Sequence, residues 1–109
     1  MALDVLCLAM NRAAVITALK GHETELKKLG VLRLSLFGSI ARDEGAEHSD
    51  VDIAVALTPG PRGLAHLERI ENIKARLSEI VGCAVDAIEE PSPSPRVQHA
   101  IEQDRVLAF

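Results

Sequence analysis

Two short apolar runs constrain the fold of this chain more than any other feature. A Gly-Ser pair ends the first run, and two aspartates one residue apart begin the second. The first run closes with Leu36-Phe37-Gly38-Ser39, and the second opens with Ser49-Asp50-Val51-Asp52. Side chains alternate along a strand, so Asp50 and Asp52 point to the same side if the second run is a strand. Two adjacent carboxylates repel each other unless a cation lies between them. The sequence therefore predicts neighbouring strands with an acidic site at their ends.

A phosphate-binding turn and a third carboxylate complete this pattern. A Gly38-Ser39 turn lets backbone N–H groups approach a phosphate closely. Asp86 stands within a third short apolar run, where strand propensity disfavours it. Nucleotidyl transfer uses two Mg²⁺ ions held by carboxylate oxygens, and a third carboxylate can complete a metal site or accept the proton of the attacking hydroxyl. These residues predict a site for a metal-bound nucleoside triphosphate.

The pattern of the other residues predicts an α/β (α+β) fold, a small mixed β-sheet flanked by helices. Apolar spacing, Gly stops and Pro-rich breaks define its elements. In chain order they are a helix over Arg12–Leu29 capped by Asn11, a strand over Val31–Phe37, a helical turn over Ser39–Arg42, a loop over Asp43–Ser49, a strand over Asp50–Leu57, a helix over Leu64–Val81 ended by Gly82, a strand over Cys83–Ile88, a loop over Glu89–Pro95, a helix over Arg96–Gln103 and a tail at Val106–Leu107.

Periodicity also predicts which faces of these elements are buried. Leu32, Leu34 and Leu36 share one face of the first strand, and Arg33 and Ser35 lie on a solvated or partner-facing side. The predicted apolar face of the long helix consists of Leu64, Leu67, Ile70, Leu77, Ile80 and Val81, and its predicted exposed face of Glu68, Arg69, Glu71, Lys74 and Arg76.

Length and composition narrow the functional classes. The 109 residues fit a single domain over 1–109, with residues 1–10 as an N-terminal extension. Aromatic residues make up 2% of the chain, with no Trp or Tyr, which argues against base stacking on single-stranded nucleic acid. A net charge of −4 argues against direct nucleic-acid binding and permits a basic protein partner.

The cysteines, the histidines and the first residues carry no further motif. Cys7 and Cys83 lack metal-ligand spacing and are expected to be buried thiols of a protein in the reducing cytoplasm. The four histidines form no ligand motif. The first ten residues are too short for a membrane span and lack the basic start of a signal peptide, so no membrane association is expected.

The segment Gly38-Ser39-x-Ala41-Arg42, followed by Ser49-Asp50-x-Asp52, resembles the signature of the DNA polymerase β-like nucleotidyltransferases. Within that superfamily, the length resembles the minimal nucleotidyltransferases, and the likeness covers nearly the whole chain. The ending Arg96-Val97-x-x-x-Ile101-x-x-Asp104 resembles the C-terminal helix of the family. The chain departs from the pattern at Asp43-Glu44-Gly45, where members often have Gly directly after the Arg.

The resemblance implies a role for each matching residue. Gly38 and Ser39 hold the triphosphate of ATP, and Arg42 contacts phosphate or braces the loop. Asp50 and Asp52 bind two Mg²⁺ ions, with Asp86 as the third catalytic and metal-binding carboxylate.

The resemblance also implies a partner. Minimal nucleotidyltransferases are often encoded beside a HEPN-type ribonuclease toxin and act as antitoxins by transferring AMP from ATP to a toxin tyrosine, releasing pyrophosphate. A homo- or hetero-oligomer is compatible with the small size and the exposed strand faces.

Simpler interpretations remain open at this point. Gly38-Ser39 alone is a common turn, the Asp50 and Asp52 pair can be a solvated strand edge, and Asp86 can lie on a surface strand. Two other functions also remain: a non-catalytic antitoxin that masks its toxin by contact, and a nucleotidyltransferase that modifies a small molecule.

Overall fold

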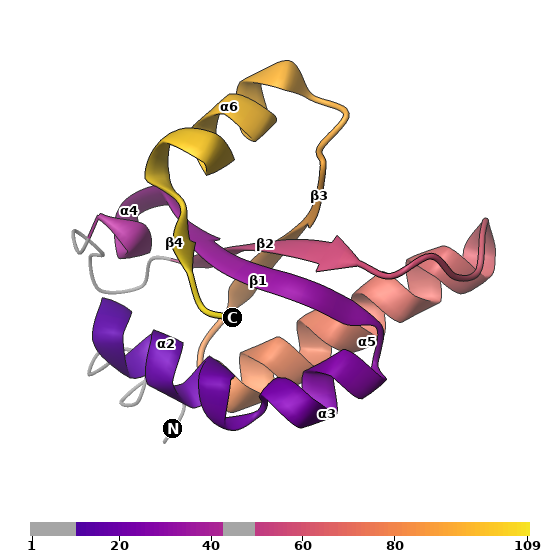
Figure 1. Ribbon diagram of the computed structural model, residues 1–109, viewed down its shortest axis with the longest axis horizontal. Helices are drawn as coiled ribbons and strands as arrows, with labels where there is room; N and C mark the ends of the chain where they lie inside the picture. The colour runs from indigo at the N-terminus through magenta and orange to yellow at the C-terminus, as the bar shows by residue number, and fades with distance from the viewer. Residues whose placement is uncertain (1–10, 43–49) are drawn as a thin grey trace.

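The computed structural model describes residues 11–42 and 50–109, and its four strands form one sheet in the order β3-β2-β1-β4 (Figure 1). β1 pairs antiparallel with both β2 and β4, and β2 pairs parallel with β3. The predicted mixed sheet flanked by helices is therefore confirmed. The helices are α2 (Arg12–Gly21), α3 (Glu23–Lys28), α4 (Gly38–Ala41), α5 (Leu64–Val81) and α6 (Pro95–Asp104), and the strands are β1 (Val31–Phe37), β2 (Val51–Leu57), β3 (Val85–Glu90) and β4 (Val106–Leu107).

The sheet separates two layers of helix. Figure 1 shows α2, α3 and α5 on one side of the strands and α6 on the other. The main core fills the first interface and includes Leu19, Leu36, Ile53 and Leu77, which are all fully buried. A smaller cluster of Phe37, Ala54 and Ile101 lies under α6. We call these the three-helix face and the α6 face.

The first predicted helix is wrong in one respect, because the structure divides it at His22. Asn11 caps α2 as predicted, and its side chain accepts a hydrogen bond from the Ala14 N–H at 2.9 Å. His22 then leaves the helical conformation, with φ −114° and ψ 16°, and a second helix starts at Glu23. Gly21 directly before this break has a low helix propensity, so the chain can turn there at little cost.

β1 has the predicted bounds, and its predicted buried face is confirmed at Leu34 and Leu36. The prediction is wrong at two other residues of the strand. Its pairing with β2 shifts register between Val31 and Arg33, and this irregularity turns Leu32 outward to 61% exposure. Val31 takes the buried place instead. Ser35 was expected on a solvated side and is fully buried, because α6 and the turn after it cover that face of the sheet.

α5 also has the predicted bounds, and Gly82 ends it in the left-handed conformation at φ 82°. Its buried residues are Ile73, Leu77 and Val81, whereas Leu64 and Leu67 are 73% and 60% exposed. The prediction of its apolar face was wrong at this first turn, which extends beyond the sheet (Figure 1).

The predicted exposed face of α5 is also wrong in part. Arg69 donates to the Thr58 carbonyl at 3.0 Å, and Arg76 binds Glu25 of α3. Both arginines are half-buried and join α5 to neighbouring segments.

The C-terminal third differs most from the prediction. β3 begins and ends two residues later than the predicted strand, so Glu89 and Glu90 belong to it and not to a loop. α6 begins at Pro95, capped by the Ser94 side chain, and ends at Asp104. The predicted tail is a fourth strand, because Val106 and Leu107 pair with Leu36 and Ser35.

Some predictions fall on residues outside the described ranges, namely the extension over 1–10, Cys7 and the loop over Asp43–Ser49. Cys83 is half-buried, which is less than predicted. Within residues 11–42 and 50–109, no helix is long and apolar enough to cross a membrane.

Candidate functional site

Two of the predicted carboxylates lie side by side at one end of the sheet. Asp52 of β2 is in register with Asp86 of β3 on one side and with Phe37 of β1 on the other. Ile53 faces the main core, so its neighbour Asp52 points to the α6 face. Asp50 precedes β2 and is exposed, as is Asp86, whereas Asp52 is half-buried. The strand pairing that brings Asp52 and Asp86 together agrees with the sequence pattern.

The surroundings of Asp52 disfavour its ionised form. Burial raises the pKa of the Asp52 carboxyl above its ordinary value, and the nearby charges of Asp86 and Asp50 raise the pKa further. Arg42 acts in the opposite direction and lowers it. The three acidic side chains and Arg42 are therefore within electrostatic reach of one another, with Asp52 at the centre of the group.

Gly38 is required where β1 ends because the Asp52 side chain occupies the space beside it. Gly38 has φ +73°, in the left-handed region that favours glycine. A Cβ atom at this position would overlap the Asp52 Oδ2 atom and lie 3.2 Å from the Asp52 Cγ atom. The backbone at Gly38 thus approaches the carboxylate directly, which connects the predicted phosphate turn to the predicted metal ligands.

Gly38 is also the first residue of α4, which is held from both faces of the sheet. Ser39 is half-buried within it. Arg12 of α2 donates from Nη1 to the Ala41 carbonyl at 2.8 Å. Arg42 follows α4, is exposed, and its Nη1 donates to Asp104 Oδ2 of α6 at 2.5 Å. Arg42 is therefore connected to α6 as well as to the Asp52 environment.

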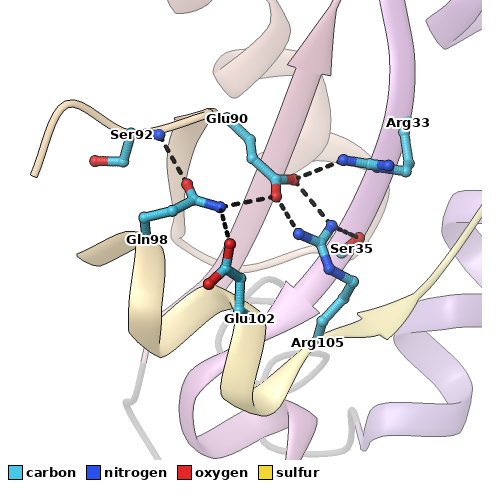
Figure 2. Close-up of polar contacts among 7 residues, drawn as sticks. All are labelled: Arg33, Ser35, Glu90, Ser92, Gln98, Glu102 and Arg105. Carbon is cyan, nitrogen blue, oxygen red and sulfur yellow. Dashed lines mark hydrogen bonds and ion pairs between the residues drawn. The ribbon is translucent and has the colours of Figure 1, made fainter. Parts of the chain in front are cut away.

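The α6 face also holds a buried ion cluster that the sequence pattern did not predict. Glu90 at the end of β3 has a side chain that is only 5% exposed. Figure 2 shows that Arg105, Arg33 and Gln98 all point toward its carboxylate, and Arg105 also donates to the Ser35 Oγ atom at 3.1 Å. These hydrogen bonds, led by the one from Arg105, hold the pKa of Glu90 below its ordinary value. We call this cluster the Glu90 clasp, and the one signal for it in the sequence was a Glu at a position assigned to a loop.

The three carboxylates are suitable ligands for a hard divalent cation, but their side chains are not arranged around one. Aspartate oxygens are the donors that Mg²⁺ prefers, and a cation would relieve the repulsion that raises the pKa of Asp52. Among residues 11–42 and 50–109, however, no three His, Cys, Asp or Glu side chains are grouped so that they could hold a metal ion. The chemistry of these donors therefore fits magnesium, although the described side chains are not gathered around one point.

A cavity of about 440 Å³ lies at the opposite end of β2 and includes none of these residues. It is lined by Leu57, the last residue of β2, by the turn over residues 58–63, by His66 and Arg69 of α5 and by Glu89 of β3. Arg69 projects into this region and fills the space beside Gly60 and Gly30. The predicted site residues therefore occupy an open end of the sheet, separate from this cavity.

Comparison with protein families and relatives identifies the architecture. The model of a nucleotidyltransferase domain matches residues 19–108. A Methanocaldococcus jannaschii protein, provisionally named protein adenylyltransferase MJ0126, is 38% identical over 90 residues, which are 81% of this chain and 88% of that protein. The protein adenylyltransferase MntA of Thermococcus cleftensis is 36% identical over 75 residues, covering 68% of this chain and 72% of that protein.

Solved structures show the same fold. One described as a minimal nucleotidyltransferase superposes with a TM-score of 0.73 at 26% identity, covering 89% of this chain and 95% of that one. A tri-AMPylated Shewanella oneidensis HEPN toxin in complex with its MNT antitoxin gives a TM-score of 0.59 at 15% identity, covering 86% of this chain and 71% of that one. The second likeness is one of fold alone.

Proposed function

We propose that this chain, which belongs to the nucleotidyltransferase domain family, is an antitoxin that transfers AMP from ATP to a tyrosine of a HEPN-type toxin. Family membership makes the chain a nucleotidyltransferase. The relatives named protein adenylyltransferases support AMP as the transferred group and protein as the acceptor. The AMPylated HEPN toxin bound to its antitoxin supports the kind of partner.

The observation that carries the proposal is the group of carboxylates around Asp52. Asp52 lies between the Gly38 backbone and Asp86, and its pKa is raised by burial and by two further carboxylates. A stable fold gains nothing from this repulsion, whereas a site for a cation and a polyphosphate requires clustered negative charge. The group therefore favours a catalytic function over a solvated strand edge.

In the proposed site, Asp50 and Asp52 hold two Mg²⁺ ions with Asp86 as the third ligand. When bound, these ions neutralise the charge that develops on the phosphate oxygens. Gly38 and Ser39 orient the triphosphate of ATP, and Arg42 binds its phosphates. The remaining catalysis comes from holding the α-phosphate in line with the acceptor hydroxyl.

The proposed reaction is a single in-line displacement. The tyrosine hydroxyl oxygen attacks the α-phosphorus, the bond from that phosphorus to the bridging oxygen breaks, and pyrophosphate leaves. The proton of the hydroxyl passes to the Asp86 carboxylate, which is exposed and reachable from solvent.

The test is transfer of label from α-labelled ATP to the HEPN-type protein encoded beside this chain, with Mg²⁺ present. We expect labelled toxin with AMP on tyrosine by mass spectrometry. Asp52→Asn should lower the rate about a thousandfold, equivalent to about 4 kcal/mol of transition-state stabilisation. Glu71→Gln removes the same charge from an exposed position on α5 and serves as the matched control.

Two outcomes would replace this proposal. If the Asp50→Ala, Asp52→Ala double variant still neutralises the toxin in cells at native expression, the chain acts by binding alone. If AMP passes to an aminoglycoside and not to the toxin, the acceptor is a small molecule.

A further inference from the structure

Two consecutive residues at the end of α6 connect the Glu90 clasp to the proposed site. Asp104 is the last residue of α6, and its Oδ2 atom accepts from Arg42 Nη1 at 2.5 Å. Arg105 follows it and donates to Glu90 and to Ser35. The side chains of two adjacent residues therefore contact Arg42, which follows α4, on one side and Glu90 at the buried end of β3 on the other.

The clasp makes this segment a firm support. Ser35 is fully buried, and the Glu90 carboxylate accepts from three different side chains (Figure 2). A buried carboxylate with several charge-assisted hydrogen bonds has few alternative positions, because moving it would leave charges unpaired. The backbone at Arg105 is thereby fixed relative to the sheet, and Asp104 is fixed with it.

Arg42, by contrast, depends on its partners for its position. Its side chain is 47% exposed, and that of Asp104 is 21% exposed. An arginine on the surface samples many rotamers unless an acceptor selects among them. A guanidinium has five N–H donors and can bind a carboxylate and other acceptors at the same time.

We propose that Asp104 is a positioning residue, which holds the Arg42 guanidinium in place to bind the polyphosphate of the nucleotide. This inference rests on the proposed function, since it assigns Asp104 a role in the same site. Asp104 does not touch the nucleotide in this scheme. It acts through Arg42, and the Glu90 clasp is the support from which it acts.

The two roles, structural and positioning, predict different measurements. A partly exposed ion pair contributes little to folding, so its loss should leave the thermal unfolding midpoint almost unchanged. Loss of a preorganised phosphate contact should weaken nucleotide binding, because the guanidinium must then be ordered when the ligand binds.

The experiment compares Asp104→Asn with wild type for binding of a non-hydrolysable ATP analogue with Mg²⁺, and for KM of ATP and kcat in AMP transfer. We expect the dissociation constant and KM to rise about fivefold to tenfold with kcat changed less than twofold. Glu102→Gln is the matched control, because it removes the same charge two residues away and can still accept from Gln98. Asp104→Glu should recover part of the affinity.

A second comparison tests whether the effect passes through Arg42. In an Arg42→Ala background, Asp104→Asn should change the affinity no further. Unchanged affinity in Asp104→Asn, tighter binding, or an equal loss in the Arg42→Ala background would each overturn the inference. The binding measurement needs no acceptor, so a wild-type protein that binds ATP but labels no toxin would contradict the proposed function alone. Absence of ATP binding by wild type would overturn both.

Discussion

The two faces of the sheet are built on different principles. The three-helix face buries a continuous apolar cluster that includes Leu19, Leu26, Ile53 and Leu77. Among the described residues, the cluster on the α6 face is small: Phe37, Ala54 and Ile101 are buried together, between the acidic site at one end and the Glu90 clasp at the other. Apolar burial supplies most folding free energy, whereas a site for charged ligands must keep charged groups near water. The three-helix face therefore supplies most of the buried apolar area, and the α6 face carries the charged groups of the proposed site.

The largest effect on folding should come from the three-helix face. Leu77→Ala removes a fully buried side chain of α5 and should lower the free energy of unfolding by about 3 kcal/mol. Leu67→Ala on the same helix removes a 60% exposed side chain and should cost under about 0.5 kcal/mol. Urea unfolding of both variants measures this difference. If Ile101→Ala under α6 lowers the free energy of unfolding as much as Leu77→Ala, the two faces do not differ in their contribution to stability.

The clasp should contribute next, through hydrogen bonds rather than apolar area. Glu90→Gln removes the charge that pairs with Arg105 and should lower the free energy of unfolding by about 2 kcal/mol. Its neighbour Glu89 is 44% exposed, and Glu89→Gln should change stability by less than about 1 kcal/mol. Equal effects of the two substitutions in urea unfolding would mean that burial of Glu90 does not matter.

Two glycine substitutions should act in opposite directions. Gly38→Ala places a side chain at φ +73° and against Asp52, so it should lower the free energy of unfolding by about 1 kcal/mol and abolish AMP transfer. Gly21→Ala at the end of α2 meets no atom within 4 Å and should stabilise the protein by up to about 1 kcal/mol. Thermal unfolding with a transfer assay separates them, and an active Gly38→Ala variant would contradict the close approach to Asp52.

The smallest effect should appear in acid, where two carboxylates of the α6 face behave oppositely. The pKa of Glu90 lies below its ordinary value of 4.5, so its stabilising contribution is present above that pH and is lost as the pH falls through the folded pKa. The pKa of Asp52 lies above 3.8, so its ionised form destabilises the fold at neutral pH and protonation relieves this as the pH falls.

The pH dependence can be measured with two variants in chelator. Glu90→Gln should be less stable than wild type at pH 7 and Asp52→Asn more stable. The difference for Glu90→Gln should shrink as the pH falls below 4.5 and through the lowered pKa of Glu90, and the difference for Asp52→Asn should shrink as the pH falls through the raised pKa of Asp52 toward 3.8. An Asp52→Asn variant that is less stable than wild type at pH 7 would contradict the assigned repulsion.

Local signals predicted the elements well where glycines bound them. Gly30 and Gly38 delimit β1, and Gly82 ends α5, so both elements have their predicted bounds. The site pattern was visible because it needs only strand alternation and a turn, both short-range properties. The structure places Asp52 beside Asp86, and the catalytic roles of these residues stay a prediction.

The errors in burial share a tertiary cause, unlike the helix break at His22, which follows from the local propensity of Gly21. The exposure of Leu32 follows from an irregularity in pairing with β2, and the exposure of Leu64 follows from where α5 passes beyond the sheet. The burial of Glu90 depends on Arg105, which lies 15 residues away in the sequence. The periodicity of the residues around Glu90 gives no sign of this contact. Sequence periodicity describes one element at a time, so contacts between distant elements are the part it misses.

The parallel pairing of β2 with β3 has a consequence for the order of folding. β1 and β2 are antiparallel neighbours in sequence, but β3 reaches β2 only after the chain has crossed through α5. Closing so long a loop is slow compared with pairing adjacent strands. We therefore expect Asp86 to join Asp52 late in folding, when the apolar core under α5 can already hold the two negative charges together.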